Sequence, residues 1–253
     1  MPVRDLELIL PEWPAPANVR AAATTRAGGV STGPFASLNL GKATEDRPEA
    51  VAANRRLLRG RLGLVREPAW LHQVHGNVVV RADAVTDPPA ADASWTDQAG
   101  VSCVVLVADC LPVLFCDRAG TRVAAAHCGW RGLASDVLGA TVRALEVEAG
   151  ELLAWLGPAI GPDAFEVGPE VRKAFTDRWP ETDAAFHASR EDRSMCDLYE
   201  IARIQLHALG VHNVFGGGHC TLTDSARFYS FRRDGLTGRM AALAWLDGTA
   251  VAE

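Results

Sequence analysis

The sequence contains no hydrophobic run long enough to span a lipid bilayer. A membrane-spanning helix needs about 18 or more consecutive apolar residues, and no stretch of the chain approaches that length. The first residues, MPVRDLELILPEWP, carry acids and prolines where a signal peptide would need a basic head and an apolar stretch. These absences predict a cytoplasmic protein with no membrane partner.

Lysine is scarce, and acids outnumber bases. Lys42 and Lys173 are the only lysines among 253 residues, and the formal net charge is −6. Proteins that bind nucleic acid normally carry a basic patch and a positive net charge. The composition therefore weighs against a nucleic-acid partner, but it allows a small anionic ligand.

Signatures of common cofactors and metal sites are also missing. The glycines at 216–218 lead into HCT rather than into the helix that follows a GxGxxG motif, which argues against NAD and nucleotide triphosphate chemistry. The chain has seven His but no HxH pair, which fits a multicopper centre poorly. It also lacks the HxE and PCxxC signature of the zinc nucleoside deaminases. Six Cys without a secretion signal favour free thiols over a disulfide framework.

Three short segments with His and Cys are the most informative part of what is present: HQVHG at 72–76, ADCLP at 108–112 and AHCGWRG at 126–132. Each adjoins an apolar run typical of a strand, namely 78–80, 101–108 and 121–126. If these strands end together, they bring their terminal side chains to one place. Three His and Cys ligands that leave a fourth position to water are typical of a catalytic zinc site. The pattern predicts His75, Cys110 and His127 as metal ligands.

The same residues could have ordinary structural roles. Lone His and Cys residues often simply pack, and the spacings match no short zinc-finger pattern. His72 is expected to support the site or to pack, because the strand-like run that follows makes it diverge from His75. Cys128 could complete a closed, structural zinc site, although it is not the expected ligand. Asp109 should point away from Cys110 in an extended segment, so we expect it to orient a loop or a ligand His.

Blocks of sequence along nearly the whole chain accompany these segments: TTRAGGVSTGPFASLNLG at 24–41, VAANRRLL at 51–58, GPAIGPDAFEVGPEV at 157–171 and CTLTDSARFYSFRRDGLTGRMAA at 220–242. In this order they resemble the YfiH-like family, once called laccase-domain or multicopper polyphenol oxidases. The blocks follow one another without a linker, which favours a single α/β domain over 1–253, with a lead-in at 1–18 and a tail at 243–253.

The resemblance implies a four-layer αββα sandwich and places the metal ligands on His75, Cys110 and His127. It also implies phosphorolysis of purine nucleosides (adenosine, inosine and methylthioadenosine), with adenosine deamination as a second activity. Purine nucleoside and phosphate would then be the small-molecule partners, and Zn²⁺ the cofactor. Cu²⁺ is the alternative metal, since affinity alone favours it. The oligomeric state is left open between a monomer and a small homo-oligomer.

Several arginines are candidates for the phosphate. Arg26 stands beside a glycine pair that allows close backbone approach, as an anion-binding turn requires. If 228–233 is a strand, Arg232 and Arg233 alternate faces, so that one reaches the pocket while the other pairs with Asp234. Arg131 is an equal candidate for substrate contact and for holding a turn.

Glu166 is likewise an equal candidate for holding a turn and for contacting substrate. The aromatic residues of the last block are expected in the core. These are Phe228, Tyr229 and Phe231.

Helices are expected at 46–62, 132–148, 168–179 and 197–210. The first begins with Asp46 as the N-cap and Glu49 three residues later, and the last begins at Asp197 and ends at Gly210. The start of the helix at 132–148 would lie near the three segments, where its free N–H groups favour an anion such as phosphate.

Other functions compete with the phosphorylase. Cys110 and His127 could form a thiol hydrolase, with Asp109 as orienting group, that edits cell-wall precursors. Copper-dependent oxidation of phenols is a weaker alternative. A zinc-stabilised interaction module without catalytic activity would unfold when its metal is removed.

Overall fold

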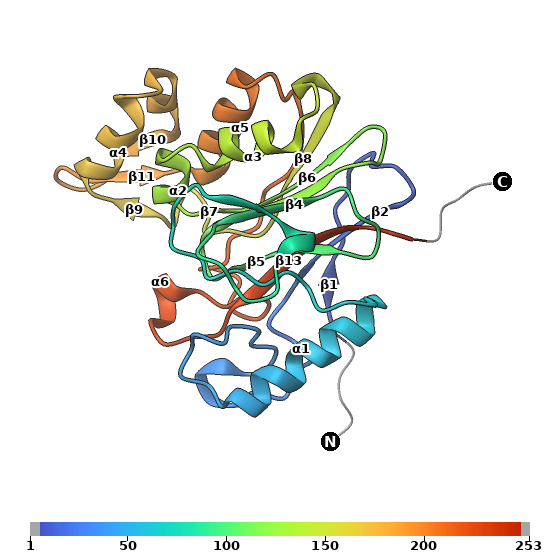
Figure 1. Ribbon diagram of the computed structural model, residues 1–253. Helices are drawn as coiled ribbons and strands as arrows, with labels where there is room; N and C mark the ends of the chain where they lie inside the picture. Colours follow the sequence, from blue (N-terminus) through green and yellow to red (C-terminus); the bar gives the residue numbers. More distant parts are fainter. Residues whose placement is uncertain (1–5, 249–253) are drawn as a thin grey trace.

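Two β-sheets lie face to face at the centre of the molecule, and helices cover the outer face of each (Figure 1). The computed structural model describes residues 6–248. In spatial order, the first sheet contains β1 (Leu8–Ile9), β2 (Val19–Thr24), β13 (Met240–Leu246) and β5 (Ser102–Val107). The second sheet contains β12 (Asn213–Gly216), β8 (Leu152–Leu156), β6 (Leu111–Asp117), β7 (Val123–Cys128), β4 (Ala93–Thr96) and β3 (Val79–Arg81). Within the second sheet β12 pairs with β8 and β3 with β4 in parallel, and the other pairs are antiparallel.

Both faces of the central strands are buried, because successive side chains of a strand point to opposite faces. In β13, Ala242 and Ala244 pack between the two sheets, whereas Ala241 and Leu243 pack under the helix on the outer face. Strands buried on both faces are apolar along their whole length, which accounts for the continuous runs seen in the sequence. The expected αββα layering is confirmed.

Helix α1 (Pro48–Leu62) covers the outer face of the first sheet through Leu58. The helix expected at 46–62 is therefore present, but Asp46 is not its N-cap. The helix starts at Pro48, whose ring disfavours helical geometry in the residue before it, so Arg47 occupies the cap position. The Asp46 carboxylate instead accepts a hydrogen bond from the Ser31 hydroxyl.

The second sheet is covered by α2 (Trp130–Ala134), α3 (Val137–Leu145), α4 (Pro169–Thr176) and α5 (Leu198–Ala208). The single helix expected at 132–148 is wrong, because the chain turns at Asp136 in a left-handed conformation with φ 69°. The helix expected at 197–210 is confirmed, and the Asp197 carboxylate accepts from the backbone N–H groups of Tyr199 and Glu200 as an N-cap.

The remaining elements lie at the periphery. A small antiparallel sheet contains β10 (Phe186–Ala188), β11 (Ser194–Cys196) and β9 (Glu166–Val167), and a short helix α6 (Phe231–Asp234) lies within the last sequence block. Within the described residues, four 3-10 turns are present: η1 (Gly33–Phe35), η2 (Ala82–Ala84), η3 (Ala149–Glu151) and η4 (Pro180–Ala185). Among the helices of residues 6–248, none reaches the length and apolar character that crossing a bilayer requires.

The expected lead-in and tail differ from the structure. Strand β1 lies within the lead-in at 1–18, and the tail expected at 243–253 begins inside β13, which is an interior strand of the first sheet. The end of the described chain is therefore part of the fold, since β13 pairs with both β2 and β5.

Candidate metal centre

His75, Cys110 and His127 meet at one end of a cavity, and their ligand atoms all lie within 4.8 Å of one another. Cys110 Sγ is 3.9 Å from His75 Nε2, and the two imidazole rings meet edge to face with centroids 4.8 Å apart. His127 is buried, Cys110 is half-buried and His75 is exposed. One thiolate and two imidazoles that are open on one side match the donor set of a catalytic zinc site, so these residues fit the metal.

The three residues come from both sheets. His127 is in β7, His75 is in the loop before β3, and Cys110 lies where the chain leaves β5 of the first sheet and enters β6 of the second. The three residues come together as expected. The adjoining strands, however, do not end side by side in one sheet, and the cluster forms at the crossing between the sheets.

Gly129 makes room for the cluster. A Cβ atom at this position would lie 2.9 Å from Cys110 Sγ and 3.1 Å from His75 Cδ2, which is closer than side-chain carbons normally pack. Helix α2 begins directly after this glycine, which is its N-cap residue. The close approach of two candidate ligands therefore explains why the first residue of the GWRG segment is a glycine.

Asp92 holds two of the ligands, although it is not among the residues predicted from the sequence. Its fully buried carboxylate accepts from His127 Nδ1 at 2.9 Å, from the His75 N–H at 2.9 Å, from the Gly76 N–H at 2.7 Å and from the Val74 N–H at 3.2 Å. A carboxylate on Nδ1 leaves Nε2 of the same ring for the metal. The only indication in the sequence is an isolated acid after a stretch rich in Pro and Ala, outside every motif.

The electrostatics of the cluster favour a thiolate. Burial alone would raise the pKa of Cys110, but the neighbouring His127 and His75 lower it below its ordinary value. Burial would conversely lower the pKa of His127, whereas Cys110 and Asp92 raise it. The thiolate is the form of cysteine that binds metal and acts as a nucleophile. Burial raises the pKa of Cys128 well above its ordinary value, and this thiol lies in the core.

Asp109 is directed away from the cluster, as expected for the residue before Cys110. Its carboxylate accepts from Thr221 Oγ1 at 2.6 Å, from Ser230 Oγ at 3.0 Å and from the Arg232 N–H at 2.7 Å. It therefore anchors the segments at 221 and 230–232. Of the two expected roles, orienting a loop or orienting a ligand His, these contacts match the first.

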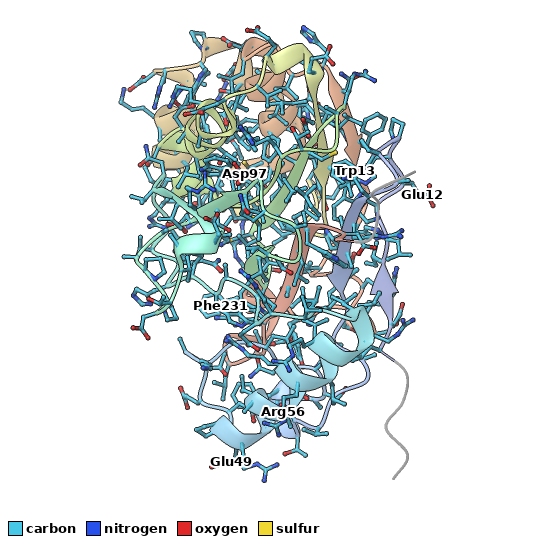
Figure 2. The ribbon with its side chains drawn as sticks, turned by 45° about the vertical axis from the view of Figure 1, so that its right-hand side comes forward. Glu12, Trp13, Glu49, Arg56, Asp97 and Phe231 are labelled. Carbon is cyan, nitrogen blue, oxygen red and sulfur yellow. The ribbon has the colours of Figure 1, made fainter. Side chains whose placement is uncertain are left out.

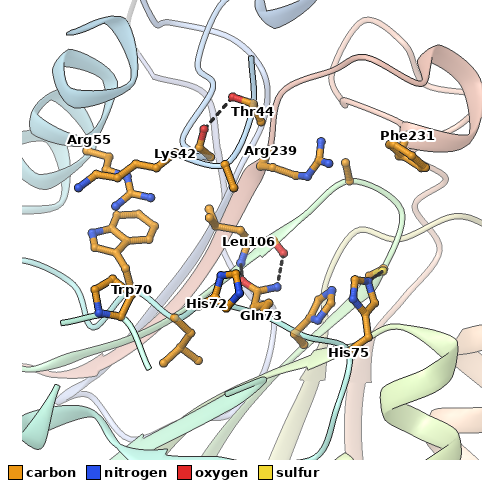
Figure 3. Close-up of a pocket in the computed structure, with 17 residues that line it drawn as sticks. Lys42, Thr44, Arg55, Trp70, His72, Gln73, His75, Leu106, Phe231 and Arg239 are labelled. Carbon is orange, nitrogen blue, oxygen red and sulfur yellow. Dashed lines mark hydrogen bonds between the residues drawn. The ribbon is translucent and has the colours of Figure 1, made fainter. Parts of the chain in front are cut away.

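The cluster opens into a cavity of about 510 Å³ (Figure 3). Lys42, Arg55 and Arg239 line it together with the three candidate ligands, and His72 also faces it. Phe231 lines the cavity as well. Its side chain is 58% exposed, so the expectation of a core position is wrong for Phe231, because α6 turns it outward.

Phe228 and Tyr229 are fully buried, which confirms the expected core position of the other two aromatic residues.

The four arginines expected at the phosphate lie outside the residues that line this cavity. Arg26 donates to the carbonyls of Ala36 and Ser225, and the Arg131 guanidinium stacks over the Trp130 ring. Their role as phosphate contacts stays a prediction without support from this geometry.

The segment at 228–233 is not the expected strand, because Phe231–Asp234 forms α6. Arg233 pairs with Asp234 as expected, at 2.7 Å, and donates to backbone carbonyls. Arg232 donates to the carbonyl of Glu166. The Glu166 side chain accepts from Arg190, so it holds the small peripheral sheet together.

Residues 20–247 match the sequence model of the family described as multi-copper polyphenol oxidoreductase laccase. The chain belongs to this YfiH-like family. The purine nucleoside phosphorylase of Pseudomonas aeruginosa is 59% identical over 239 residues, which cover 94% of this chain and 98% of the relative. The purine nucleoside phosphorylase YfiH of Escherichia coli is 49% identical over 243 residues, covering 95% and 99%.

The fold of this YfiH-like chain is also that of a solved structure. The crystal structure of the Neisseria meningitidis protein NMB0706 is 52% identical and superposes with a TM-score of 0.93, covering 95% of this chain and 99% of the other. The resemblance stated from the sequence blocks is confirmed.

Proposed function

We propose that this YfiH-like protein is a zinc-dependent purine nucleoside phosphorylase that acts on adenosine, inosine and methylthioadenosine. The observation that carries the proposal is the cluster of His75, Cys110 and His127, which opens into a cavity of about 510 Å³. A cavity of this size lies in the usual range for small-molecule sites. The relatives named purine nucleoside phosphorylase support the same activity.

The reaction sets two demands on the site. Phosphate attacks the anomeric carbon of the sugar while the purine departs, and the sugar becomes cation-like on the way. The departing base also benefits from a proton or from another electrophile. When bound, zinc would supply a Lewis acid at the cluster. Asp92 would keep the His127 ring oriented through the hydrogen bond to Nδ1.

Adenosine deamination belongs to the proposal as a second activity of the same cavity. In this reaction water replaces the exocyclic amino group of the purine, and ammonia leaves. The site must therefore admit the purine ring to the metal end, where His75 is exposed.

Chromatography of the products tests the function directly. Zinc-loaded protein is incubated with adenosine with and without phosphate, beside His75→Ala, Cys110→Ala and the surface control His212→Ala. We expect adenine and ribose 1-phosphate only with phosphate, loss of both in the first two variants, and no change in the control. Inosine formed without phosphate reports deamination. Inosine and methylthioadenosine are incubated in the same way, and if wild type turns over none of the three nucleosides, the phosphorylase proposal is wrong.

The nature of the metal is tested in the same preparation. Elemental analysis of the purified protein, followed by reloading of the apoprotein with Zn²⁺ or Cu²⁺, shows which metal supports turnover. We expect zinc to restore activity. A copper-loaded protein that oxidises phenols instead would favour the alternative suggested by the name of the family.

One observation favours a second candidate, a thiol hydrolase that edits cell-wall precursors. Cys110, His127 and Asp92 follow one another as thiol, imidazole and carboxylate, which is the order of a nucleophile, its base and an orienting group. A hydrolase of this type needs no metal. Precursor hydrolysis that survives chelation but is abolished by alkylation of Cys110 would support it, whereas loss of all turnover on chelation would exclude it.

A further inference from the structure

The residues of the described chain that line the cavity include cations but no acid. Lys42, Arg55 and Arg239 line it, and no Asp or Glu is among the described residues that do so. This local excess of cations stands in a protein whose formal net charge is −6. A cleft lined with charge of one sign raises the local concentration of ligands with the opposite sign.

Several arginines elsewhere in the molecule have acidic partners. Arg81 lies 2.7 Å from Asp97, and Arg172 lies 2.7 Å from Asp183. Within residues 6–248, none of the three cavity cations forms such a pair. The cavity that contains the metal cluster therefore brings together three cations that form no ion pair within the described chain.

Arg55 shows that this charge is costly to the fold. Its side chain is 7% exposed, its Nε and Nη2 both donate to the Leu40 carbonyl, and its guanidinium stacks 3.6 Å from the Trp70 ring centre. Burial lowers its pKa to about 10, although the charge of Glu67 acts in the opposite direction. Because an unpaired buried cation destabilises a protein, a ligand anion is the natural partner for this region.

Arg239 has the free edge that would receive the anion. Its Nη1 donates to the carbonyls of Thr237 and Gly238 at 3.0 and 2.9 Å, which fixes the guanidinium. Its Nε and Nη2 have no hydrogen-bond partner in the described part of the chain. These two groups form one side of the guanidinium fork, which matches two oxygens of a phosphate.

The loop beside Arg239 is built to hold it in place. Asn39 is fully buried, and its side-chain oxygen accepts from the backbone N–H groups of Gly41 and Arg239. A Cβ at Gly41 would lie 2.8 Å from Arg239 Cγ, so only glycine allows this approach. Thr44 closes the loop by donating to the Gly41 carbonyl (Figure 3). Arg239 is therefore positioned before any ligand arrives.

We propose that the Nε and Nη2 edge of Arg239 binds the phosphate that attacks the nucleoside, while Lys42 adds positive charge at the rim of the cavity. The assignment rests on the proposed phosphorylase function and gives its second substrate a place. The Arg239 guanidinium lies 5.7 Å from the Phe231 ring centre, and its side chain extends toward Phe231 rather than toward Trp70 (Figure 3). Arg55 then serves to hold the loop through the Leu40 carbonyl.

Binding of inorganic phosphate tests the subsite without reference to turnover. Titration calorimetry is run on metal-loaded wild type, Arg239→Gln, Arg239→Lys, Lys42→Gln and Arg56→Gln. Arg56 is the matched control, because it is an exposed arginine on α1 outside the cavity (Figure 2). Loss of a charge-assisted hydrogen bond predicts a dissociation constant about 10- to 100-fold higher in Arg239→Gln. Arg239→Lys should keep part of the phosphate affinity that Arg239→Gln loses. Lys42→Gln should lose less affinity than Arg239→Gln, and Arg56→Gln should match wild type.

Equal phosphate affinity in Arg239→Gln and Arg56→Gln would overturn the assignment, provided that both variants keep the wild-type circular dichroism spectrum. If Arg239→Gln fails to fold, Arg239→Lys decides the question through the same titration. A larger loss of phosphate affinity in Lys42→Gln than in Arg239→Gln would also overturn it.

Kinetics separate the subsite from the reaction. We expect Arg239→Gln to raise the KM for phosphate while the KM for adenosine changes little. Phosphate binding that depends on Arg239 in a protein that releases no adenine would leave the subsite standing and refute the phosphorylase. Adenine release by Arg239→Gln with an unchanged KM for phosphate would refute the subsite and leave the phosphorylase standing. Titration with AMP distinguishes a site for a nucleotide phosphate from a site for free phosphate. If the binding of AMP depends on Arg239 and the binding of inorganic phosphate does not, the assignment to the free anion is overturned.

Discussion

Two buried aspartates stand close to the candidate ligands, and they act on different parts of the site. Asp92 contacts the ring of His127 and three N–H groups of the loop that carries His75. Asp109 is the neighbour of Cys110 in the chain, yet its carboxylate holds Thr221 and the start of α6. One carboxylate sets the geometry of the ligands, and the other fixes the segments behind them.

The difference shows that adjacency in the chain is a poor guide to contact at this site. Cys110 and Asp109 point apart at a bend between β5 and β6, where Asp109 has a positive φ of 92°. Asp92 reaches the cluster because β4 pairs with β7, which puts it beside His127. The comparison can be tested by changing each carboxylate separately.

Removal of the Asp92 carboxylate should have the largest effect. Asp92→Ala leaves His127 Nδ1 and three backbone N–H groups without their acceptor in a buried place. We expect the free energy of unfolding to fall by about 3–5 kcal/mol, as when one partner of a buried pair is deleted, and tight metal binding to be lost. Urea unfolding and zinc titration measure both quantities. Wild-type zinc affinity in this variant would show that Asp92 does not orient the ligands.

A smaller change isolates orientation from stability. Asp92→Asn keeps the size of the side chain and one acceptor oxygen, so we expect the metal affinity to fall about 10- to 100-fold with the fold retained. The visible absorption spectrum of the Co²⁺-substituted protein should also shift, because it reports ligand geometry.

Asp117→Asn is the matched control for this change. Asp117 is also buried and accepts from Thr121 and Arg122, but it lies at the end of β6 away from Cys110. The Asp117→Asn variant should be less stable than wild type, while its cobalt spectrum and its metal affinity stay unchanged. Equal loss of metal affinity in both variants would mean that Asp92 acts only through general stability.

The Asp109 carboxylate should matter more for stability than for the metal. Asn, like Asp, tolerates a positive φ, so Asp109→Asn removes the charge without adding backbone strain. Weaker hydrogen bonds to Thr221 and Ser230 should lower the free energy of unfolding by about 1–3 kcal/mol. Zinc titration should show a smaller loss of affinity than in Asp92→Asn, and the reverse order would invert the comparison between the two acids.

Much of the fold could be predicted because its causes are local. The apolar runs at 101–108 and 121–126 became strands, and the helix at 197–210 carries its own cap at Asp197. The candidate ligands could be found for the same reason, since each stands in a short segment beside a strand. The resemblance of the sequence blocks then supplied the order of the layers.

The features that the sequence did not predict depend on contacts between distant segments. The break at Asp136 is reinforced by ion pairs with Arg143 and with Arg178 of a later segment. Asp92 became visible only when β4 and β7 were paired. Arg239 is one arginine among many, and only the loop around Asn39 distinguishes it. Periodicity and motif spacing contain no information about such pairings.

Cys128 provides the smallest expected effect and a final test of the open site. His127 and Cys128 are successive residues of β7, so their side chains point to opposite faces, and the Cys128 thiol packs in the core beside the carbonyl of Ala126. Cys128→Ala should cost about 1 kcal/mol of stability, as a typical substitution does, and leave zinc stoichiometry and affinity unchanged. Cys110→Ala should abolish zinc binding in the same titration. Reduced zinc affinity in Cys128→Ala would instead indicate a closed site with four protein ligands, and unfolding on chelation would then be expected.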